Sequence, residues 1–313
     1  MPRKIIIDTD PGIDDAVALL LALAAPEELE LLGVVAVAGN LPLAQTERNV
    51  RRVCELAGRP EIAVYAGCAG PLLRPLATAH AIHGDALEAR LGRPEPTMPV
   101  RAQHGVDFII EALRAAEPGS VTICALGPLT DIAMALVKAP DIAAGLGEVV
   151  VMGGAGFEIG NITPAAEFNI HVDPHAAAIV LARGVPVTMI PLDVTHQVLS
   201  TPPRLAALDA LGNRCGPAVA TLLAGFEAAR ASRFGERGRA LHDPCVVAYL
   251  LRPELLTGRE VNVAVETASP LTMGMTVVDW WSVTGRPPNA TFMTGVDAEG
   301  LYSLLNERIA RLP

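Results

Sequence analysis

Four aspartates stand within eight residues near the start of the chain, in the segment IIIDTDPGIDDA at residues 5–16. They are Asp8, Asp10, Asp14 and Asp15. The β-branched run before them suits a buried strand, the Pro-Gly pair a tight turn, and the apolar residues 16–25 a buried helix. Four like charges so close repel one another unless protons or a cation neutralise them. A solvated turn with a capping aspartate explains only one or two of the four, so we favour a hard cation held by oxygen ligands.

Two other acidic motifs begin in a similar way. An EF-hand fails, because Gly12 arrives one place early and the closing position is Leu19 instead of a glutamate. A phosphatase of the haloacid dehalogenase type also starts with a strand and Asp-x-Asp, which would make Asp8 the nucleophile and Asp10 the acid/base. That alternative leaves Asp14 and Asp15 unexplained, and we find no convincing later lysine and acidic pair. It remains the second interpretation of this segment.

The segment AEFN at residues 166–169 is a second polar group. A carboxylate and an amide two residues apart on one strand, Glu167 and Asn169, point to the same side. Together with Asn161 they offer donors and acceptors that suit sugar hydroxyls. A polar loop with a capping asparagine explains the same residues equally well.

The segment LHDPC at residues 241–245 is a third. Its Asp-Pro step predicts a helix start, with Asp243 at the N-cap and Pro244 at the first helical position. A functional interpretation adds a metal ligand at Asp243 and a histidine, His242, beside it. A histidine near a cationic site can deliver a proton near neutral pH.

Strand-like and helix-like segments alternate through most of the chain, which favours an open, mostly parallel, doubly wound (Rossmann-like) α/β sheet with helices on both faces. We expect one domain over residues 1–313, with a flap at 66–99 and a polar stretch at 232–240. In such sheets ligands bind at the carboxyl ends of the strands, where the aspartates lie. The predicted strands are 4–8, 31–37, 61–65, 121–125, 148–152, 186–191, 261–266, 275–281 and 290–293. The predicted helices are 14–25, 42–57, 105–116, 129–138, 174–183, 203–211, 217–231 and 245–251.

Composition limits the possible partners. The 313 residues carry a net charge of −10, which argues against nucleic acid, because phosphate binding needs a basic face. The longest apolar run, ten residues, is too short to span a membrane, and the basic start leads directly into a strand, so we predict no signal peptide. Five scattered cysteines without a C-x-x-C pair suit reduced thiols in a cytoplasmic protein.

Taken together, these segments resemble the calcium-dependent nucleoside hydrolases, the inosine-uridine-preferring nucleoside hydrolase family. Matching segments, in the family's order and spacing, cover nearly the full length. They are Asp8–Ala16, Gly39-Asn40, Ile82–Gly84, Leu126–Thr130, Val150–Gly154, Gly160-Asn161, Glu167–Asn169, Leu192–His196 and His242–Tyr249.

The resemblance implies an α/β enzyme that cleaves the N-glycosidic bond of ribonucleosides. It implies Ca²⁺ bound by the side chains of Asp10, Asp15 and Asp243 and by the backbone carbonyl of Leu126. Asp10 would also be the general base for the attacking water, which Asn40 would help to orient. The residues implied to hold the ribose hydroxyls are Asp14, Met152, Asn161, Glu167 and Asn169.

The resemblance also places His242 near the leaving base, with His83 on the flap as a second candidate, and Phe168 could pack against the nucleoside. Base selectivity stays open, because the tyrosines expected before the HDP segment are missing and Glu227 or Arg230 stand there instead. We expect a homo-oligomer, since family members commonly form dimers or tetramers. The alternative of a different class is a calcium- or ribose-binding protein without catalysis. Retention of Asp10, Asn40 and His242 together favours the enzyme.

Overall fold

A computed structural model describes residues 1–84, 87, 95–224 and 238–313. Its centre is a nine-stranded open sheet in the order β10-β9-β11-β6-β5-β4-β1-β2-β3. Neighbours from β11 to β3 run parallel, and β9 pairs antiparallel with both β11 and β10. The strands are β1 (Arg3–Thr9), β2 (Leu29–Ala36), β3 (Val64–Ala66), β4 (Val121–Ala125), β5 (Leu146–Met152), β6 (Val187–Ile190), β9 (Leu256–Val265), β10 (Thr276–Asp279) and β11 (Ala290–Val296). The short strands β7 (Leu199–Ser200) and β8 (Arg239–Ala240) form a separate antiparallel pair.

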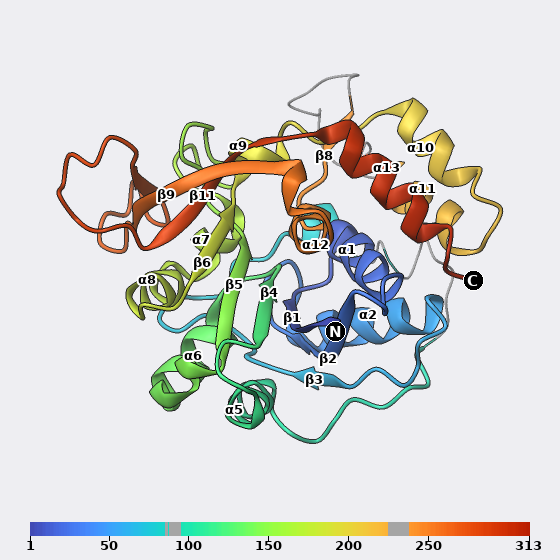
Figure 1. Cartoon of the computed structure of the whole chain (residues 1–313), viewed down its shortest axis with the longest axis horizontal. Coiled ribbons are helices and arrows are strands. Elements are labelled where there is room, and N and C mark those ends of the chain that lie inside the picture. Colours follow the sequence, from blue (N-terminus) through green and yellow to red (C-terminus); the bar gives the residue numbers. More distant parts are fainter. Residues whose placement is uncertain (85–86, 88–94, 225–237) are drawn as a thin grey trace.

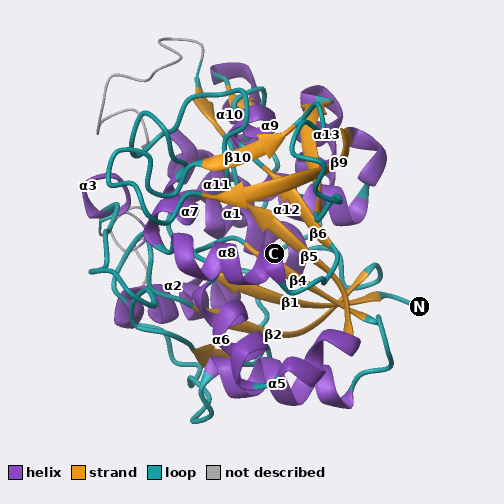
Figure 2. Cartoon of the chain, turned by 90° about the vertical axis from the view of Figure 1, so that its left-hand side faces the viewer, coloured by secondary structure: helices purple, strands orange, loops and turns teal. Residues whose placement is uncertain are grey.

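Helices cover both faces of the sheet, as Figures 1 and 2 show. They are α1 (Ile13–Leu23), α2 (Leu43–Leu56), α3 (His80–His83), α5 (Gly105–Ala115), α6 (Thr130–Lys138), α7 (Phe168–Val172), α8 (Pro174–Ala182), α9 (Leu192–Thr195), α10 (Pro202–Asp209), α11 (Cys215–Ala224), α12 (Pro244–Leu251) and α13 (Ala298–Ile309). The predicted mostly parallel, open α/β fold is confirmed.

The first strand shows how the sequence produces this layering. Ile5 and Ile7 belong to one apolar cluster, together with α1 and α12, whereas Ile6 belongs to the cluster on the opposite face, with α5 and α6. All three side chains are fully buried. Successive side chains of a strand point to opposite faces, so a continuous β-branched run is what a strand covered on both sides requires.

The prediction is wrong at residues 166–169, and it omits the helices α3, α9 and α13 and the short strands β7 and β8. Residues 166–169 are not a strand: Glu167 is the N-cap of the five-residue helix α7, and the adjacent Phe168 begins it. Helix α13 at the C-terminus has no counterpart in the prediction, although Asp297 caps it by accepting the Gly300 N–H. Smaller differences lie at the ends of elements, such as β9, which begins at Leu256 instead of residue 261.

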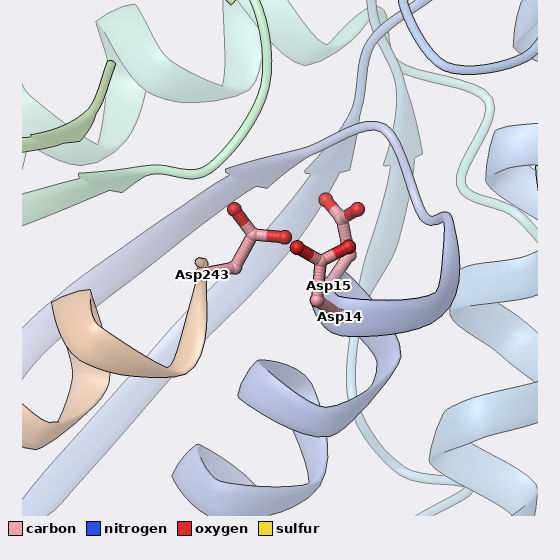
Figure 3. A group of neighbouring side chains, drawn as sticks. All are labelled: Asp14, Asp15 and Asp243. Carbon is pink, nitrogen blue, oxygen red and sulfur yellow. The ribbon is translucent and has the colours of Figure 1, made fainter. Parts of the chain in front are cut away.

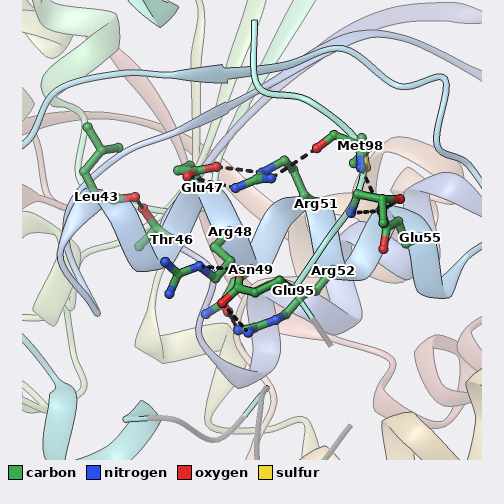
Figure 4. Close-up of polar contacts among 11 residues, drawn as sticks. Leu43, Thr46, Glu47, Arg48, Asn49, Arg51, Arg52, Glu55, Glu95 and Met98 are labelled. Carbon is green, nitrogen blue, oxygen red and sulfur yellow. Dashed lines mark hydrogen bonds and ion pairs between the residues drawn. The ribbon is translucent and has the colours of Figure 1, made fainter. Parts of the chain in front are cut away.

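Helix α2 contacts the turn between β1 and α1, which carries the aspartates. One face of this helix is buried, and on that face the Asn49 side chain donates to the Pro11 carbonyl oxygen at 3.0 Å. Its polar face carries the Arg51–Glu47 ion pair and holds the backbone at Thr97 and Met98 through Glu55 (Figure 4). The helix therefore ties the end of the predicted flap to the turn that carries the acidic residues.

All five cysteines are free thiols, and four of them are buried. Within the described ranges, no helix has the length and apolar character that crossing a membrane requires.

Candidate active site

The turn between β1 and α1 is built around the Asp15 carboxylate. Its Oδ1 accepts the Thr9 hydroxyl at 2.6 Å and its Oδ2 accepts the Gly12 N–H at 3.0 Å. The side-chain amide of Asn40, in the loop that follows β2, donates to the same Oδ2 at 3.2 Å. Asp14 and Asp15 lie in the first turn of α1, where the helix dipole favours negative charge. The carboxyl ends of β1 and β2 therefore meet at Asp15.

Asp10 lies beside this turn, and its carboxylate occupies space that a side chain at residue 39 or 127 would fill. Its Oδ2 accepts the Asn40 N–H at 2.6 Å, while its buried Oδ1 finds no hydrogen-bond partner among the described residues. A Cβ on Gly39 would lie 2.1 Å from Oδ2, and one on Gly127 would lie 2.7 Å from Oδ1. Burial and the Asp15 charge raise the pKa of Asp10 well above its usual range. A buried oxygen without a donor is what a cation or an attacking water would complete.

Three carboxylates converge next to Asp10. Asp14, Asp15 and Asp243 each offer an oxygen, and these oxygens all lie within 4.8 Å of one another (Figure 3). All three side chains are buried. Hard oxygen donors of this number and spacing suit a cation such as calcium. Within the described residues, the group that meets this spacing includes Asp14, a predicted ribose ligand, but not Asp10, a predicted metal ligand.

Asp243 reaches this group from α12. It occupies the N-cap position and Pro244 the first helical position, as predicted, but the Asp243 side chain makes no capping hydrogen bond. Burial, followed by the charges of Asp14 and Asp15, raises its pKa well above the usual range. The carboxylate thus faces other carboxylates instead of its own helix, which favours the ligand interpretation over the capping one.

A second polar group joins β4, β5 and α7. The Asn169 side-chain amide donates to the carbonyl oxygens of Leu126 at 2.7 Å and Met152 at 3.1 Å, so three of the predicted site residues touch. Glu167 accepts the backbone N–H groups of Asn169, Ile170 and Gly154. Because a carbonyl oxygen has two lone pairs, the Leu126 carbonyl keeps one for a cation.

Burial brings the pKa of two carboxyl groups of the site close to 7. It raises the pKa of Asp14 to about 7, with the Asp15 charge adding to the effect. It raises the pKa of Glu167 to about 7 against the lowering effect of the backbone N–H groups of Asn169, Ile170 and Gly154. Strong perturbation of several carboxyls in one place is typical of functional sites.

His242 lies between the acidic group and a second histidine. Its backbone N–H donates to the Asp14 carboxylate, and its Nδ1 lies 2.8 Å from the Thr195 hydroxyl. The His196 ring meets the His242 ring edge-on, with 6.0 Å between their centroids. Burial, followed by His196 and His83, lowers the pKa of His242 to about 3. The ring is therefore neutral near pH 7 and carries one N–H.

His83 reaches the site from α3, in the predicted flap. Its Nδ1 accepts the Ile13 N–H at 3.1 Å, and its ring packs so closely on Gly12 that a Cβ there would lie 2.2 Å from Nδ1. The side chain is 7% exposed. His83 thus contacts the aspartate turn directly.

Other predicted residues are less closely involved. Asn161 is exposed, and its backbone N–H donates to the Ala166 oxygen, while Phe168 is half-buried at the start of α7. Glu227 and Arg230, considered as base contacts, lie outside the described residues, as do residues 225–231 of the predicted helix 217–231.

The family resemblance assigned no role to Asp8 or Thr195, and Asp8 had one only as the nucleophile of the phosphatase alternative. The buried Asp8 carboxyl lies beside Asp131, and burial followed by that neighbour raises its pKa well above the usual range. The Asp-x-Asp spacing drew attention to Asp8, but nothing in the sequence pointed to Asp131. Thr195 belongs to the segment Leu192–His196, which the resemblance included without a function for its hydroxyl.

Known proteins are similar to this chain over its whole length. The family model "Inosine-uridine preferring nucleoside hydrolase" matches residues 5–303. An uncharacterized protein of Schizosaccharomyces pombe is 53% identical, and the match covers 99% of this chain and 100% of that protein. The pyrimidine-specific ribonucleoside hydrolase RihA of Salmonella gallinarum is 44% identical, with 99% of each chain covered. The solved structure of a purine-preferring ribonucleoside hydrolase from Gardnerella vaginalis has a TM-score of 0.88 at 32% identity, with 98% of each chain covered.

The family model covers every site residue, and relatives with a stated activity are ribonucleoside hydrolases. These matches give no support to a phosphatase or to a calcium- or ribose-binding protein without catalysis. The buried carboxylates and the histidine beside them form one site, and the family model covers all of these residues. This chain is a member of the inosine-uridine preferring nucleoside hydrolase family, an enzyme that hydrolyses the N-glycosidic bond of ribonucleosides.

Proposed function

We propose that the hydrolysis depends on Ca²⁺ held by Asp10, Asp15, Asp243 and the Leu126 carbonyl. The observation that carries this proposal is the buried Oδ1 of Asp10, which has no partner among the described residues and lies beside three converging carboxylates. Asp14 belongs to the same group and faces both the cation and the ribose. When bound, calcium supplies a hard Lewis acid that lowers the pKa of water and holds hydroxyl oxygens.

The residues of the site divide the chemistry between them. Asp10 takes the proton from the attacking water, and Asn40 holds the Asp10 carboxylate in place through its N–H. The attack passes through an oxocarbenium-like state, whose positive charge nearby carboxylates stabilise. Direct attack by water inverts the anomeric centre, so the first product is α-ribose.

The ribose hydroxyls are held opposite this water. Asp14, Glu167 and Asn169 supply buried acceptors and donors, and Met152 closes the subsite. Asn161 joins them from its exposed loop when substrate is present. Phe168 packs against the nucleoside. Glu167 and Asn169 are already fixed by backbone contacts, so they lose little freedom when the sugar arrives.

The leaving base departs toward the histidines. His242 donates a hydrogen bond to it through the ring N–H, and His83, at the aspartate turn, is the second group on that side. Arg230 and Glu227 are candidates for further base contacts. We propose a preference for pyrimidine nucleosides, supported by the 44% identity with RihA against 32% with the purine-preferring enzyme.

Release of ribose from uridine, cytidine, inosine, adenosine and guanosine tests the base preference. We expect faster turnover of uridine and cytidine than of the three purine nucleosides. Faster turnover of inosine or guanosine than of uridine would contradict the preference while leaving the hydrolase assignment intact.

Calorimetric titration of chelator-treated protein tests the cation. We expect Ca²⁺ to bind with one-to-one stoichiometry, and Asp243→Asn to weaken that binding. The matched control is Asp209→Asn, which changes an exposed aspartate at the end of α10. Unchanged affinity in Asp243→Asn would remove Asp243 from the ligand set.

Residues 1–313 form one nucleoside hydrolase domain in this proposal, as the family match to residues 5–303 supports. We also propose a cytoplasmic homo-oligomer, either a dimer or a tetramer, that acts on small ribonucleosides and binds neither nucleic acid nor membrane. The net charge of −10 supports the exclusion of nucleic acid. Light scattering coupled to gel filtration would establish the number of subunits.

A further inference from the structure

The short helix α9 places a hydroxyl against His242. Thr195 ends this helix, which follows the carboxyl end of β6, and its side chain is fully buried. Its Oγ1 lies 2.8 Å from Nδ1 of His242, 47 residues further along the chain. The two residues come from different elements, so the contact depends on the fold and not on local sequence.

The direction of this hydrogen bond follows from the partners available. Within the described part of the chain, the Thr195 hydroxyl contacts no acceptor other than His242 Nδ1. If Nδ1 carried the ring proton, the buried hydroxyl hydrogen would have no partner, which costs free energy. The hydroxyl therefore donates to Nδ1. A neutral imidazole has one N–H, so that proton stands on Nε2.

Helix α9 is itself held firmly. The Asp193 carboxylate accepts the backbone N–H groups of Gly156 at 2.8 Å, Phe157 at 2.6 Å and Glu158 at 3.1 Å. The Leu192 N–H donates to the Gly154 oxygen at 2.9 Å. These bonds fasten α9 to the segment that follows β5, so Thr195 has a fixed place from which to orient a ring.

We propose that Thr195 is a positioning residue for nucleoside hydrolysis, which fixes the orientation and tautomer of His242 so that Nε2–H faces the leaving base. As the bond between the anomeric carbon and the base nitrogen breaks, its electron pair goes to the base. The negative charge that develops on the base is stabilised by the hydrogen bond from Nε2–H, the base takes its proton from solvent water, and the neutral ring keeps its own proton. This inference rests on the proposed role of His242 as donor to the base.

Two substitutions separate the hydroxyl from the space it fills. Thr195→Val keeps the shape and removes the hydroxyl, and Thr195→Ser keeps the hydroxyl. The matched control is Thr188→Val in β6, which removes another buried hydroxyl, bonded to Glu148 at 2.5 Å. All variants are compared with the wild type in calcium-containing buffer, on uridine and on p-nitrophenyl riboside, whose leaving group needs no proton.

We expect Thr195→Val to lower kcat on uridine by about tenfold or more, because an oriented hydrogen-bond donor to the charge that develops on the base contributes at least that much. The same variant should keep p-nitrophenyl riboside turnover within about twofold, and Thr195→Ser should restore most of the uridine rate. Thr188→Val should leave both rates unchanged. Equal losses on the two substrates, or no loss on uridine, would overturn the proposal.

The tautomer is measured without turnover, by nitrogen-15 NMR of the His242 ring, with its signals assigned from the His242→Ala spectrum. We expect the wild type and Thr195→Ser to show a protonated Nε2 and an unprotonated Nδ1. Thr195→Val should show a shifted equilibrium between the two tautomers. A protonated Nδ1 in the wild type would overturn the proposal even if the enzyme is active. An inactive wild type with the expected tautomer would instead contradict the proposed function.

Discussion

The main-chain N–H of Asn40 lies 2.6 Å from Oδ2 of Asp10, and this contact joins the carboxyl ends of β2 and β1. It occupies one carboxylate oxygen with a donor that cannot turn away, since it belongs to the backbone. The other oxygen, Oδ1, is buried without a partner among the described residues. The carboxylate is thus oriented before any ligand arrives, which is what a general base requires.

Replacing Asp10 with asparagine should lower kcat by roughly 10³-fold, because the amide cannot take a proton from water. The side chain keeps its size, so the melting temperature should stay close to that of the wild type. Steady-state kinetics on uridine and a thermal unfolding scan measure the two effects. A variant with nearly normal kcat would remove Asp10 from the role of base.

The space around Asp10 gives a second prediction. Gly39→Ala places a Cβ 2.1 Å from Oδ2 of Asp10, so the carboxylate must move and turnover should fall by roughly 10²-fold. Gly70→Ala is the matched control, because a Cβ there meets nothing within 4 Å. Equal activity of the two variants would show that the exact place of Asp10 does not matter.

Removal of the His242 side chain should affect substrates unequally. His242→Ala should slow uridine hydrolysis by roughly 10²-fold, since the departing base loses its hydrogen-bond donor. It should slow p-nitrophenyl riboside much less, because p-nitrophenolate leaves without a proton. The ratio of the two kcat values is the measurement. If both substrates lost the same factor, His242 would act through binding or structure instead.

Metal-free protein should become less stable as the pH rises. Burial raises the pKa of Asp14 and of Glu167 to about 7, so the folded state holds these protons more tightly than the unfolded chain does. Their contribution to stability is complete at low pH and is lost as the pH rises through about 7. In chelator, the melting temperature should therefore fall between about pH 5.5 and pH 8.5.

Calcium should reduce that fall, because a bound cation favours the ionised carboxylates and stabilises the folded state by mass action. The measurement is a set of thermal scans at both pH values, with chelator and with calcium. A metal-free melting temperature that stays level or rises with pH would show that these carboxyls do not keep their protons in the folded state.

Much of the sheet and the aspartate turn followed from local sequence. The β-branched run before Asp8 predicted a strand, the Pro-Gly pair a turn and the apolar residues after it a helix. The structure confirms all three. The N-cap position of Asp243 also followed from the Asp-Pro step. The strand order was not predicted, although the pairing of β1 with β2 agrees with the tendency of consecutive strands to lie side by side.

Contacts between distant segments did not follow. The bond between Thr195 and His242 spans 47 residues, and Asn169 reaches Leu126 across 43, so no spacing in the sequence announces either one. Helix α7 was mistaken for a strand because five residues are too few to show a helical period. The sequence also did not show that Asp14, and not Asp10, belongs to the group of three carboxylates. The directions of side chains at the start of a helix depend on the conformation of the turn before it.

The dependence of ribose release from uridine on calcium tests the central claim most directly. Enzyme in calcium should release ribose, enzyme with excess EGTA should lose nearly all of that activity, and added calcium should restore it. Full activity in EGTA, on protein shown by elemental analysis to hold no metal, would contradict a catalytic cation at Asp10, Asp15 and Asp243.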